Sequence, residues 1–348
     1  MMGGDSMKKT IDYVMKFAKE LLQMPSPSGY CHLIIERICE EAKRFGYSAE
    51  LTKKGNAVIT VPGRTGRVLG LSGHVDTLGA MVRSVTADGG IRFTTIGSPI
   101  WPTLDGEYCM IQTREGRQFT GTFLSSSPAS HVFKDAGTVE RSPEKMYVRI
   151  DEVVHSAADV AALGIAPGDY IFFDPKTILT PAGFLKSRFL DDKISVAILF
   201  GLMKRLHETG SVPEPTLKIV ISTYEEVGHG AAWMPAVDEM IAVDMGCVGD
   251  DLGCTEEMVS ICCKDSSGPY DYRITSELVR LAKETGLDYA CDVYPYYGSD
   301  VSAALRGGQD LRGGLIGPGV HASHGMERTH AKGIENTLRL LLAYLSQK

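Results

Sequence analysis

Apolar residues recur at intervals of three or four positions through residues 11–22 and again through residues 35–45. This spacing places them on one face of a helix. Proline and glycine residues at positions 25–29 interrupt the first series, and Gly46 ends the second. The pattern therefore predicts two amphipathic helices at the start of the chain.

Short apolar runs bounded by glycine follow the two helices, at residues 57–62 and 68–72. Runs of this kind are typical of strands that are buried on both faces of a sheet. Beyond residue 191, apolar runs alternate with helical periods and indicate an α/β sheet domain. They predict strands at 218–223, 240–243 and 258–262, and helices at 192–207, 276–286 and 335–346.

The pattern of apolar and polar residues changes between residues 78 and 177. Short alternating segments are separated there by Gly, Asp, Ser and Pro, with one helical patch near residues 157–163. The pattern predicts a small β-rich unit of about 100 residues. We therefore expect an α/β domain formed by residues 7–77 and 178–348, interrupted by a β-rich insert at residues 78–177.

Composition narrows the class of protein. The chain has 348 residues, a formal net charge of −7 and no basic cluster, which argues against nucleic-acid binding. No apolar run approaches the roughly 18 residues of a membrane span, and the N-terminus lacks the apolar region of a signal peptide. The eight cysteines are scattered without a C-x-x-C pair, as the reduced thiols of a cytosolic protein are. We expect a cytoplasmic protein that binds neither nucleic acid nor membranes.

Acidic residues and histidines stand where the predicted strands end, which is the edge at which open α/β sheets bind ligands. His74 and Asp76 follow the run at 68–72, and two residues apart on an extended segment they point the same way. The carboxylate of Asp76 could then orient a metal-bound imidazole or bind the metal itself. The alternative is a His–Asp hydrogen bond within a turn.

Two pairs of adjacent carboxylates lie further along the chain. Asp191 and Asp192 open a predicted helix, where Asp192 could act as a cap while Asp191 faces elsewhere. Glu225 and Glu226 follow a strand that should be buried, and cations could compensate their charge there. On an extended segment the two glutamates would point in opposite directions, so one could bind metal while the other acts on water. A solvated loop is the alternative.

Asp244 closes the predicted strand at 240–243, and three histidines at positions 321, 324 and 330 precede the last helix. Spacing alone does not choose among these histidines. The combined ligand set is two histidines and three carboxylates, without cysteine. Such a set suits Zn²⁺, Co²⁺ or Mn²⁺, and an odd carboxylate can bridge two ions.

The order of the segments G-H-x-D, L-D-D-K, E-E-V-G, V-D and S-H-x-x-E resembles the dinuclear metallo-aminopeptidases of the glutamyl and deblocking aminopeptidase group, the tetrahedral aminopeptidases of metallopeptidase family forty-two. The resemblance covers essentially the whole chain, insert included. It implies a zinc-peptidase-like α/β fold with a mixed sheet and helices on both of its faces.

The resemblance also implies a role for each matching residue. Asp191 would bridge two divalent ions, Glu225 would be the general base, and Asp76 would orient His74. His324 is chosen among the histidines because the family's ligand stands three residues before an acid, here Glu327. The other metal ligands implied are His74, Glu226, Asp244 and His324.

The function implied is a metal-dependent aminopeptidase that trims short peptides, assembled as dimers within a dodecamer. Alternatives are an amino-acid deacylase or carboxypeptidase on the same scaffold, an endoglucanase, or a catalytically silent assembly protein. Three segments depart from the family pattern, so the resemblance does not define the substrate pocket. They are Lys193–Ser195, Gly325 and the glycine-rich Gly307–Gly314.

Overall fold

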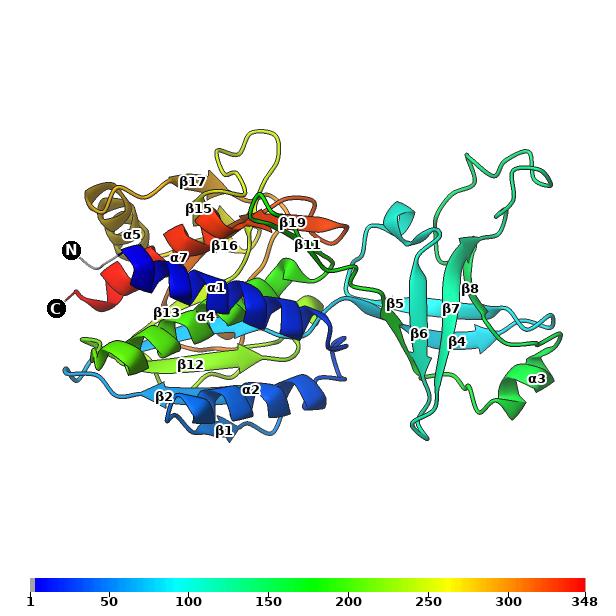
Figure 1. Ribbon diagram of the computed structural model, residues 1–348, viewed down its shortest axis with the longest axis horizontal. Coiled ribbons are helices and arrows are strands. Elements are labelled where there is room, and N and C mark those ends of the chain that lie inside the picture. Colours follow the sequence, from blue (N-terminus) through cyan, green and yellow to red (C-terminus); the bar gives the residue numbers. More distant parts are fainter. Residues whose placement is uncertain (1–3, 348) are drawn as a thin grey trace. The chain divides into compact units, whose positions relative to one another are not determined.

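A computed structural model describes residues 4–347 of the chain, which divide into two structural units (Figure 1). The first unit is formed by the segments up to Thr77 and from Lys176 onward. The second unit is Leu78–Pro175.

The first unit is built on a mixed sheet of ten strands. Its four central strands are parallel and lie in the order β12 (Thr216–Ser222), β3 (Val68–His74), β13 (Glu239–Val243) and β18 (Arg312–Val320). Because these strands are parallel, their carboxyl ends meet at one edge of the sheet. The flanking strands are β1 (Ala49–Leu51), β2 (Ala57–Val61), β14 (Gly246–Cys247), β15 (Val259–Asp265), β16 (Gly268–Pro269) and β17 (Tyr289–Val293).

Helices cover both faces of this sheet. Gly73 and Gly314 lie on one face, where they approach α4 and α5, whereas Gly313 on the opposite face approaches α6. α1 and α7 pack against α4, and the predicted α/β class with a mixed sheet is confirmed. The helices of this unit are α1 (Gly4–Leu22), α2 (His32–Arg44), α4 (Leu190–Thr209), α5 (Tyr272–Glu284), α6 (Asp300–Arg306) and α7 (Ala331–Leu345).

The glycine-rich region near residue 310 contains the start of a central strand, which sequence patterning did not predict. A Cβ atom on Gly317 would overlap the backbone carbonyl oxygen of Asp244, and one on Gly313 would overlap Val301. Glycine is therefore required at these positions of β18 because neighbouring atoms occupy the space of a side chain. The glycines allow close packing within and against the sheet, and they let β18 approach the segment that carries Asp244.

A small sheet of three antiparallel strands accompanies the main one. It pairs β10 (Ile178–Leu179) with β11 (Phe184–Ser187), and β11 with β19 (Glu327–His330). The β11–β19 pairing sets Ser187 opposite Glu327. It therefore holds the chain that leads into α4 beside the chain that follows β18.

The second unit is a closed barrel in which six strands follow the order β4-β5-β8-β7-β6-β9 (Figure 1). The rings of Phe93, Phe123 and Phe173 pack edge to face inside it, with centroids 4.8 and 5.3 Å apart. Among the helices within residues 4–347, none combines the length and apolar character that a membrane span requires. The elements of this unit are β4 (Gly79–Val85), β5 (Ile91–Ile96), the 3₁₀ helix η1 (Trp101–Leu104), β6 (Tyr108–Gln112), β7 (Gln118–Ser125), β8 (Met146–Ile150), α3 (Ala157–Ala162) and β9 (Tyr170–Phe173).

Candidate metal centre

The carboxyl ends of the four parallel strands bring together the residues singled out from the sequence. His74 is the last residue of β3, and Asp244 directly follows β13. The two glutamates follow β12, His324 follows β18, and Asp191 is the second residue of α4. The edge of the sheet thus collects two imidazoles and several carboxylates that lie far apart in the sequence.

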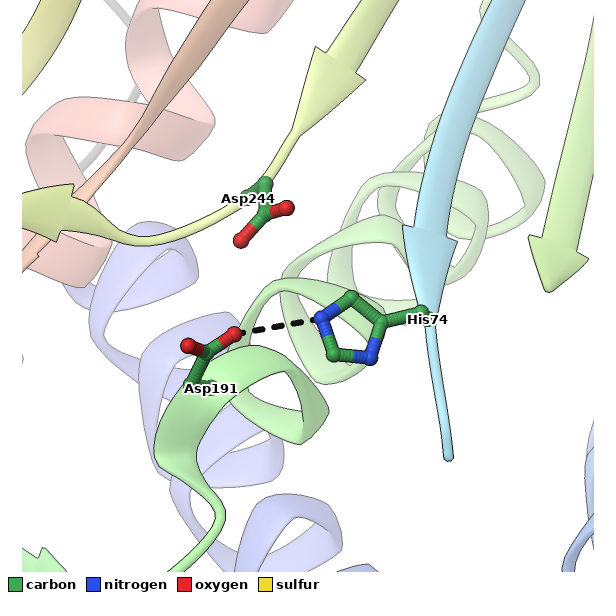
Figure 2. A group of neighbouring side chains, drawn as sticks. All are labelled: His74, Asp191 and Asp244. Carbon is green, nitrogen blue, oxygen red and sulfur yellow. Dashed lines mark hydrogen bonds and ion pairs between the residues drawn. The ribbon is translucent and has the colours of Figure 1, made fainter. Parts of the chain in front are cut away.

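His74, Asp191 and Asp244 form a first group of possible ligands (Figure 2). One nitrogen or oxygen atom from each lies within 4.8 Å of the others. The Nε2 atom of His74 is 3.1 Å from Oδ1 of Asp191. All three residues are buried, so solvent does not compensate the charges of the two carboxylates.

Asp191, Glu226 and His324 form a second group of the same size. His324 Nε2 lies 3.5 Å from Asp191 Oδ2 and 3.5 Å from Glu226 Oε2. Asp191 therefore turns one carboxylate oxygen toward each imidazole. Since it belongs to both groups, its position is the one that a carboxylate bridging two cations would occupy.

Asp76 connects β3 to the glutamates. Its carboxylate accepts hydrogen bonds from the backbone N–H of Glu225 at 3.0 Å and of Glu226 at 3.2 Å, and from the Ser28 hydroxyl at 2.5 Å. His74 Nδ1 lies 2.9 Å from the backbone oxygen of Asp76 and 3.5 Å from Oδ1. Asp76 thus contacts both the imidazole and the glutamate segment.

The expectation that Glu225 and Glu226 stand on an extended segment is wrong. The segment Glu225–Val227 is a short 3₁₀ helix, η2. Both glutamate N–H groups point to one carboxylate, that of Asp76, which favours a turn over a continued strand. The different directions of the two glutamates follow from this turn and not from strand alternation.

The two glutamate side chains have different surroundings. Glu226 belongs to the second ligand group, and its side chain is 4% exposed. Glu225 belongs to neither group, and its side chain is 15% exposed with Oε2 3.8 Å from His74 Nε2. Glu225 therefore borders the first group, and its side chain is more exposed than that of Glu226.

Two further buried carboxylates support the ligands. Glu327 accepts hydrogen bonds from the backbone N–H of His324 at 2.9 Å and of Asp191 at 3.1 Å. Asp192 accepts one from the backbone N–H of His74 at 3.2 Å. Asp192 is thus directed to β3, and the suggestion that it caps the helix is wrong.

Crowding and burial perturb the pKa values of these groups. Burial, with the charge of Asp191, raises the pKa of Asp244 to about 7 and that of Glu327 to about 8. Burial also raises the pKa of Glu225 and of Glu226 well above the ordinary glutamate value. These carboxyl groups therefore bind protons near neutral pH when no cation is present to balance their charge.

Burial alone would raise the pKa of Asp191, but hydrogen bonds from His324 and His74 hold it below the ordinary value. The opposite balance holds for His74. Burial alone would lower its pKa, but Asp191 and Asp76 raise it well above the ordinary value. Asp191 therefore carries the most persistent negative charge at the point where the two groups meet.

The residues present fit a pair of divalent cations. Among the described residues, the buried Oε1 of Glu226, a member of the second group, has no hydrogen-bond partner. A buried carboxylate oxygen without a donor is destabilising unless a cation approaches it. The donors are imidazole nitrogens and carboxylate oxygens without thiolate, which suits Zn²⁺ and related ions.

Of the three tyrosines at positions 294, 296 and 297, one approaches the centre. The Tyr297 hydroxyl donates a hydrogen bond to the backbone oxygen of Met245 at 3.1 Å, next to Asp244. Tyr294 is buried in the core beside β15, and Tyr296 is 96% exposed. Tyrosine identity alone could not distinguish these three environments.

The sequence of this chain is similar to those of known aminopeptidases. Residues 55–340 match the sequence model of a family described as M42 glutamyl aminopeptidase. The chain is 44% identical over 344 residues to the YhfE protein of Bacillus subtilis strain 168, whose name proposes an aminopeptidase, covering 98% of each chain. It is 25% identical over 242 residues to the glutamyl aminopeptidase of Lactococcus lactis, covering 68% of this chain and 67% of that protein.

The fold is also found among solved structures. The TET1 peptidase of Pyrococcus horikoshii, described as able to assemble into a tetrahedron or a large octahedral shell, superposes with a TM-score of 0.84 at 21% identity. The match covers 96% of this chain and 100% of that one. The likeness extends over both structural units of the chain.

Proposed function

The chain belongs to the M42 glutamyl aminopeptidase family, and we propose that it is a metal-dependent aminopeptidase that releases N-terminal residues from short peptides. The observation that carries the proposal is the pair of ligand groups that share Asp191. A carboxylate shared by two sites would hold two cations close together, as two-metal hydrolysis requires.

We assign His74, Asp191 and Asp244 to one ion, and Asp191, Glu226 and His324 to the other. Zn²⁺ fits this donor set, with Co²⁺ and Mn²⁺ as alternatives. When bound, two such ions supply Lewis acidity that polarises the scissile carbonyl and lowers the pKa of water. Asp76 holds the imidazole of His74 from its other nitrogen, as the partners of metal-binding histidines do.

Glu225 is proposed as the general base. Its carboxylate lies at the edge of the first group, is partly exposed, and is not required as a ligand. It can accept the proton of the attacking water and then deliver that proton to the amine of the departing peptide.

We also propose that the protein is a cytoplasmic homo-oligomer assembled through the barrel unit. The support is the assembly described for the Pyrococcus TET1 structure and the exposure of apolar side chains on the barrel unit, where Val132 is 73% and Val153 is 89% exposed. Light scattering should give a mass several times the 37.7 kDa of one chain. A monomer at micromolar concentration would contradict this part of the proposal.

The activity is tested with the zinc-loaded protein and a panel of aminoacyl-anilides with free amino groups, their N-acetylated counterparts, and short peptides. We expect hydrolysis of the free-amino substrates that a chelator abolishes and added zinc restores. Cleavage of the acetylated substrates alone would instead indicate a deacylase, and release of C-terminal residues a carboxypeptidase. Chelator-insensitive cleavage of cellulose would indicate a glycosidase.

A further inference from the structure

The loop between Ser222 and Ala231, which we call the glutamate loop, carries both Glu225 and Glu226. It leaves the sheet at the end of β12 and passes through η2. Asp76 holds the middle of this loop through the N–H groups of the two glutamates. That contact alone does not determine where the two ends of the loop lie.

Asp300 joins the two ends of the glutamate loop. It is the first residue of α6, comes from a distant part of the sequence, and is only 2% exposed. Its Oδ2 accepts a hydrogen bond from the Ser222 hydroxyl at 2.7 Å, and its Oδ1 accepts one from the Ala231 backbone N–H at 2.9 Å. One carboxylate thus closes the loop across its base.

The packing at Gly230 shows how closely the carboxylate fits. A Cβ atom at this position would overlap Oδ1 of Asp300. The same atom would lie 3.0 Å from Ser222 Oγ and 3.1 Å from the Cα atom of Glu225. The base of the loop, the Asp300 carboxylate and the backbone of Glu225 are therefore in one tightly packed group.

Two residues that precede β2 also hold the ends of the loop. Asn56 Nδ2 donates to the Gly230 carbonyl oxygen at 3.1 Å, and Lys54 Nζ donates to the same oxygen at 3.0 Å. The Thr223 hydroxyl donates to Asn56 Oδ1 at 2.9 Å. Asn56 therefore also links the two ends of the loop, and loss of Asp300 would remove the contacts at Ser222 and Ala231 while those at Thr223 and Gly230 remain.

We propose that Asp300 is a positioning residue that fixes the Glu225 carboxylate by closing the glutamate loop. The inference rests on the proposed function, since it assumes that Glu225 is the general base. Asp300 acts through Ser222 and Ala231 and touches neither the ligand groups nor the substrate. A displacement of a catalytic group by about 1 Å can lower a rate by roughly 10²-fold, so a contact of this kind has a measurable effect.

The test compares Asp300→Ala and Asp300→Asn in the zinc-loaded protein, at saturating zinc, after the wild-type protein has been shown to hydrolyse an aminoacyl-anilide. Asp300→Ala should lower kcat by roughly 10²-fold with KM close to the wild-type value. Asp300→Asn should recover most of kcat, because its amide oxygen can accept from Ala231 while its NH₂ group donates to the Ser222 hydroxyl. Asparagine removes the charge of Asp300 and keeps its two hydrogen bonds. Recovery of kcat would therefore show that the hydrogen bonds, and not the charge, position the loop.

The matched control is Asp292→Ala. Asp292 is a buried residue of β17. Its carboxylate accepts a hydrogen bond at 2.8 Å from the backbone N–H of Gly253, which lies in a loop without site residues. It should lower the melting temperature and leave kcat unchanged. If Asp300→Ala does not fold, Gly230→Ala displaces the Asp300 carboxylate from the loop and should lower kcat in the same way.

Three results would overturn the inference: an unchanged kcat in Asp300→Ala or in Gly230→Ala, an equal loss of kcat in Asp292→Ala, or no recovery in Asp300→Asn. A wild-type protein without metal-dependent hydrolysis would instead count against the proposed function. The two failures are therefore distinguishable.

Discussion

The backbone N–H of Asp191 donates a hydrogen bond to Oε2 of Glu327 at 3.1 Å. The other oxygen of Glu327 accepts from the backbone N–H of His324 at 2.9 Å. One carboxylate therefore fixes the main chain beside two of the three residues in the second ligand group. Glu327 thus supports the second ligand group through hydrogen bonds, as the partners of metal ligands commonly do.

Replacement of Glu327 by glutamine should weaken zinc binding at the second group. One of its two acceptor oxygens becomes an NH₂ group that faces a backbone N–H, so a ligand loses its support. Mutation of a hydrogen-bonding partner of this kind typically lowers metal affinity by roughly 10–100-fold. Competitive titration against a zinc chelator measures the change.

Glu239→Gln is the matched control for this variant, because Glu239 is also buried but begins β13, at the other end of the strand from Asp244. It bonds to Arg67 and Arg312, so its replacement should lower stability and leave zinc affinity unchanged. Equal zinc affinities for the Glu327 variant and wild type would contradict the role of Glu327.

Glu225 and Glu226 should respond differently to the same substitution. Glu226→Gln should lower zinc occupancy, because a neutral amide is a weaker ligand than a carboxylate. Glu225→Gln should keep its zinc while turnover falls by roughly 10²–10⁴-fold, the usual contribution of a general base. Bound zinc and turnover are measured on both purified variants. The reverse pattern would exchange the two roles, and normal activity in both would exclude the two-metal interpretation.

The stability of the metal-free protein should fall as the pH rises from about 6 to about 8. Asp244, with a pKa raised to about 7, and His74, with a raised pKa, both bind protons more tightly folded than unfolded. The unfolded state then holds fewer protons in this range, so unfolding becomes easier as protons are removed. Urea unfolding at the two pH values measures this, and zinc should stabilise the protein more at the higher pH. A metal-free protein that is more stable at pH 8 than at pH 6 would contradict the raised pKa values of Asp244 and His74.

Gly317→Ala should destabilise the protein by about 3 kcal/mol or more, because the added Cβ atom overlaps the carbonyl oxygen of Asp244 and backbone atoms cannot move aside easily. Gly66→Ala is the control, since Gly66 is exposed and has no atom within 4 Å of the added Cβ. Thermal unfolding compares the two variants. Equal melting temperatures would show that β18 tolerates side chains at this position.

The candidate site could be assembled from the sequence because each ligand follows a recognisable signal. His74 and Asp244 end runs of apolar residues that are typical of buried strands, and Asp191 opens a long helix. The carboxyl ends of parallel strands converge, so the chemistry of these ends could be combined before their geometry was known. Choosing His324 among three histidines required the resemblance to a known family.

Other features could not be predicted because they depend on contacts between distant residues. β18 contains four glycines, which are rare in strands, and the reason for them lies in the backbone of Asp244. The turn at Glu225 depends on two hydrogen bonds to Asp76. α6 has seven residues, too few for a helical period to be recognised, and its residue Asp300 acts on residues that lie 69 and 78 positions earlier in the chain.

Zinc stoichiometry, measured by equilibrium dialysis, tests whether two divalent ions are held by the two groups that share Asp191. We expect two zinc ions per wild-type chain, one in Asp244→Ala, and neither held tightly in Asp191→Ala. A wild-type chain that binds one ion or none, or an Asp191→Ala variant that retains two, would contradict this expectation.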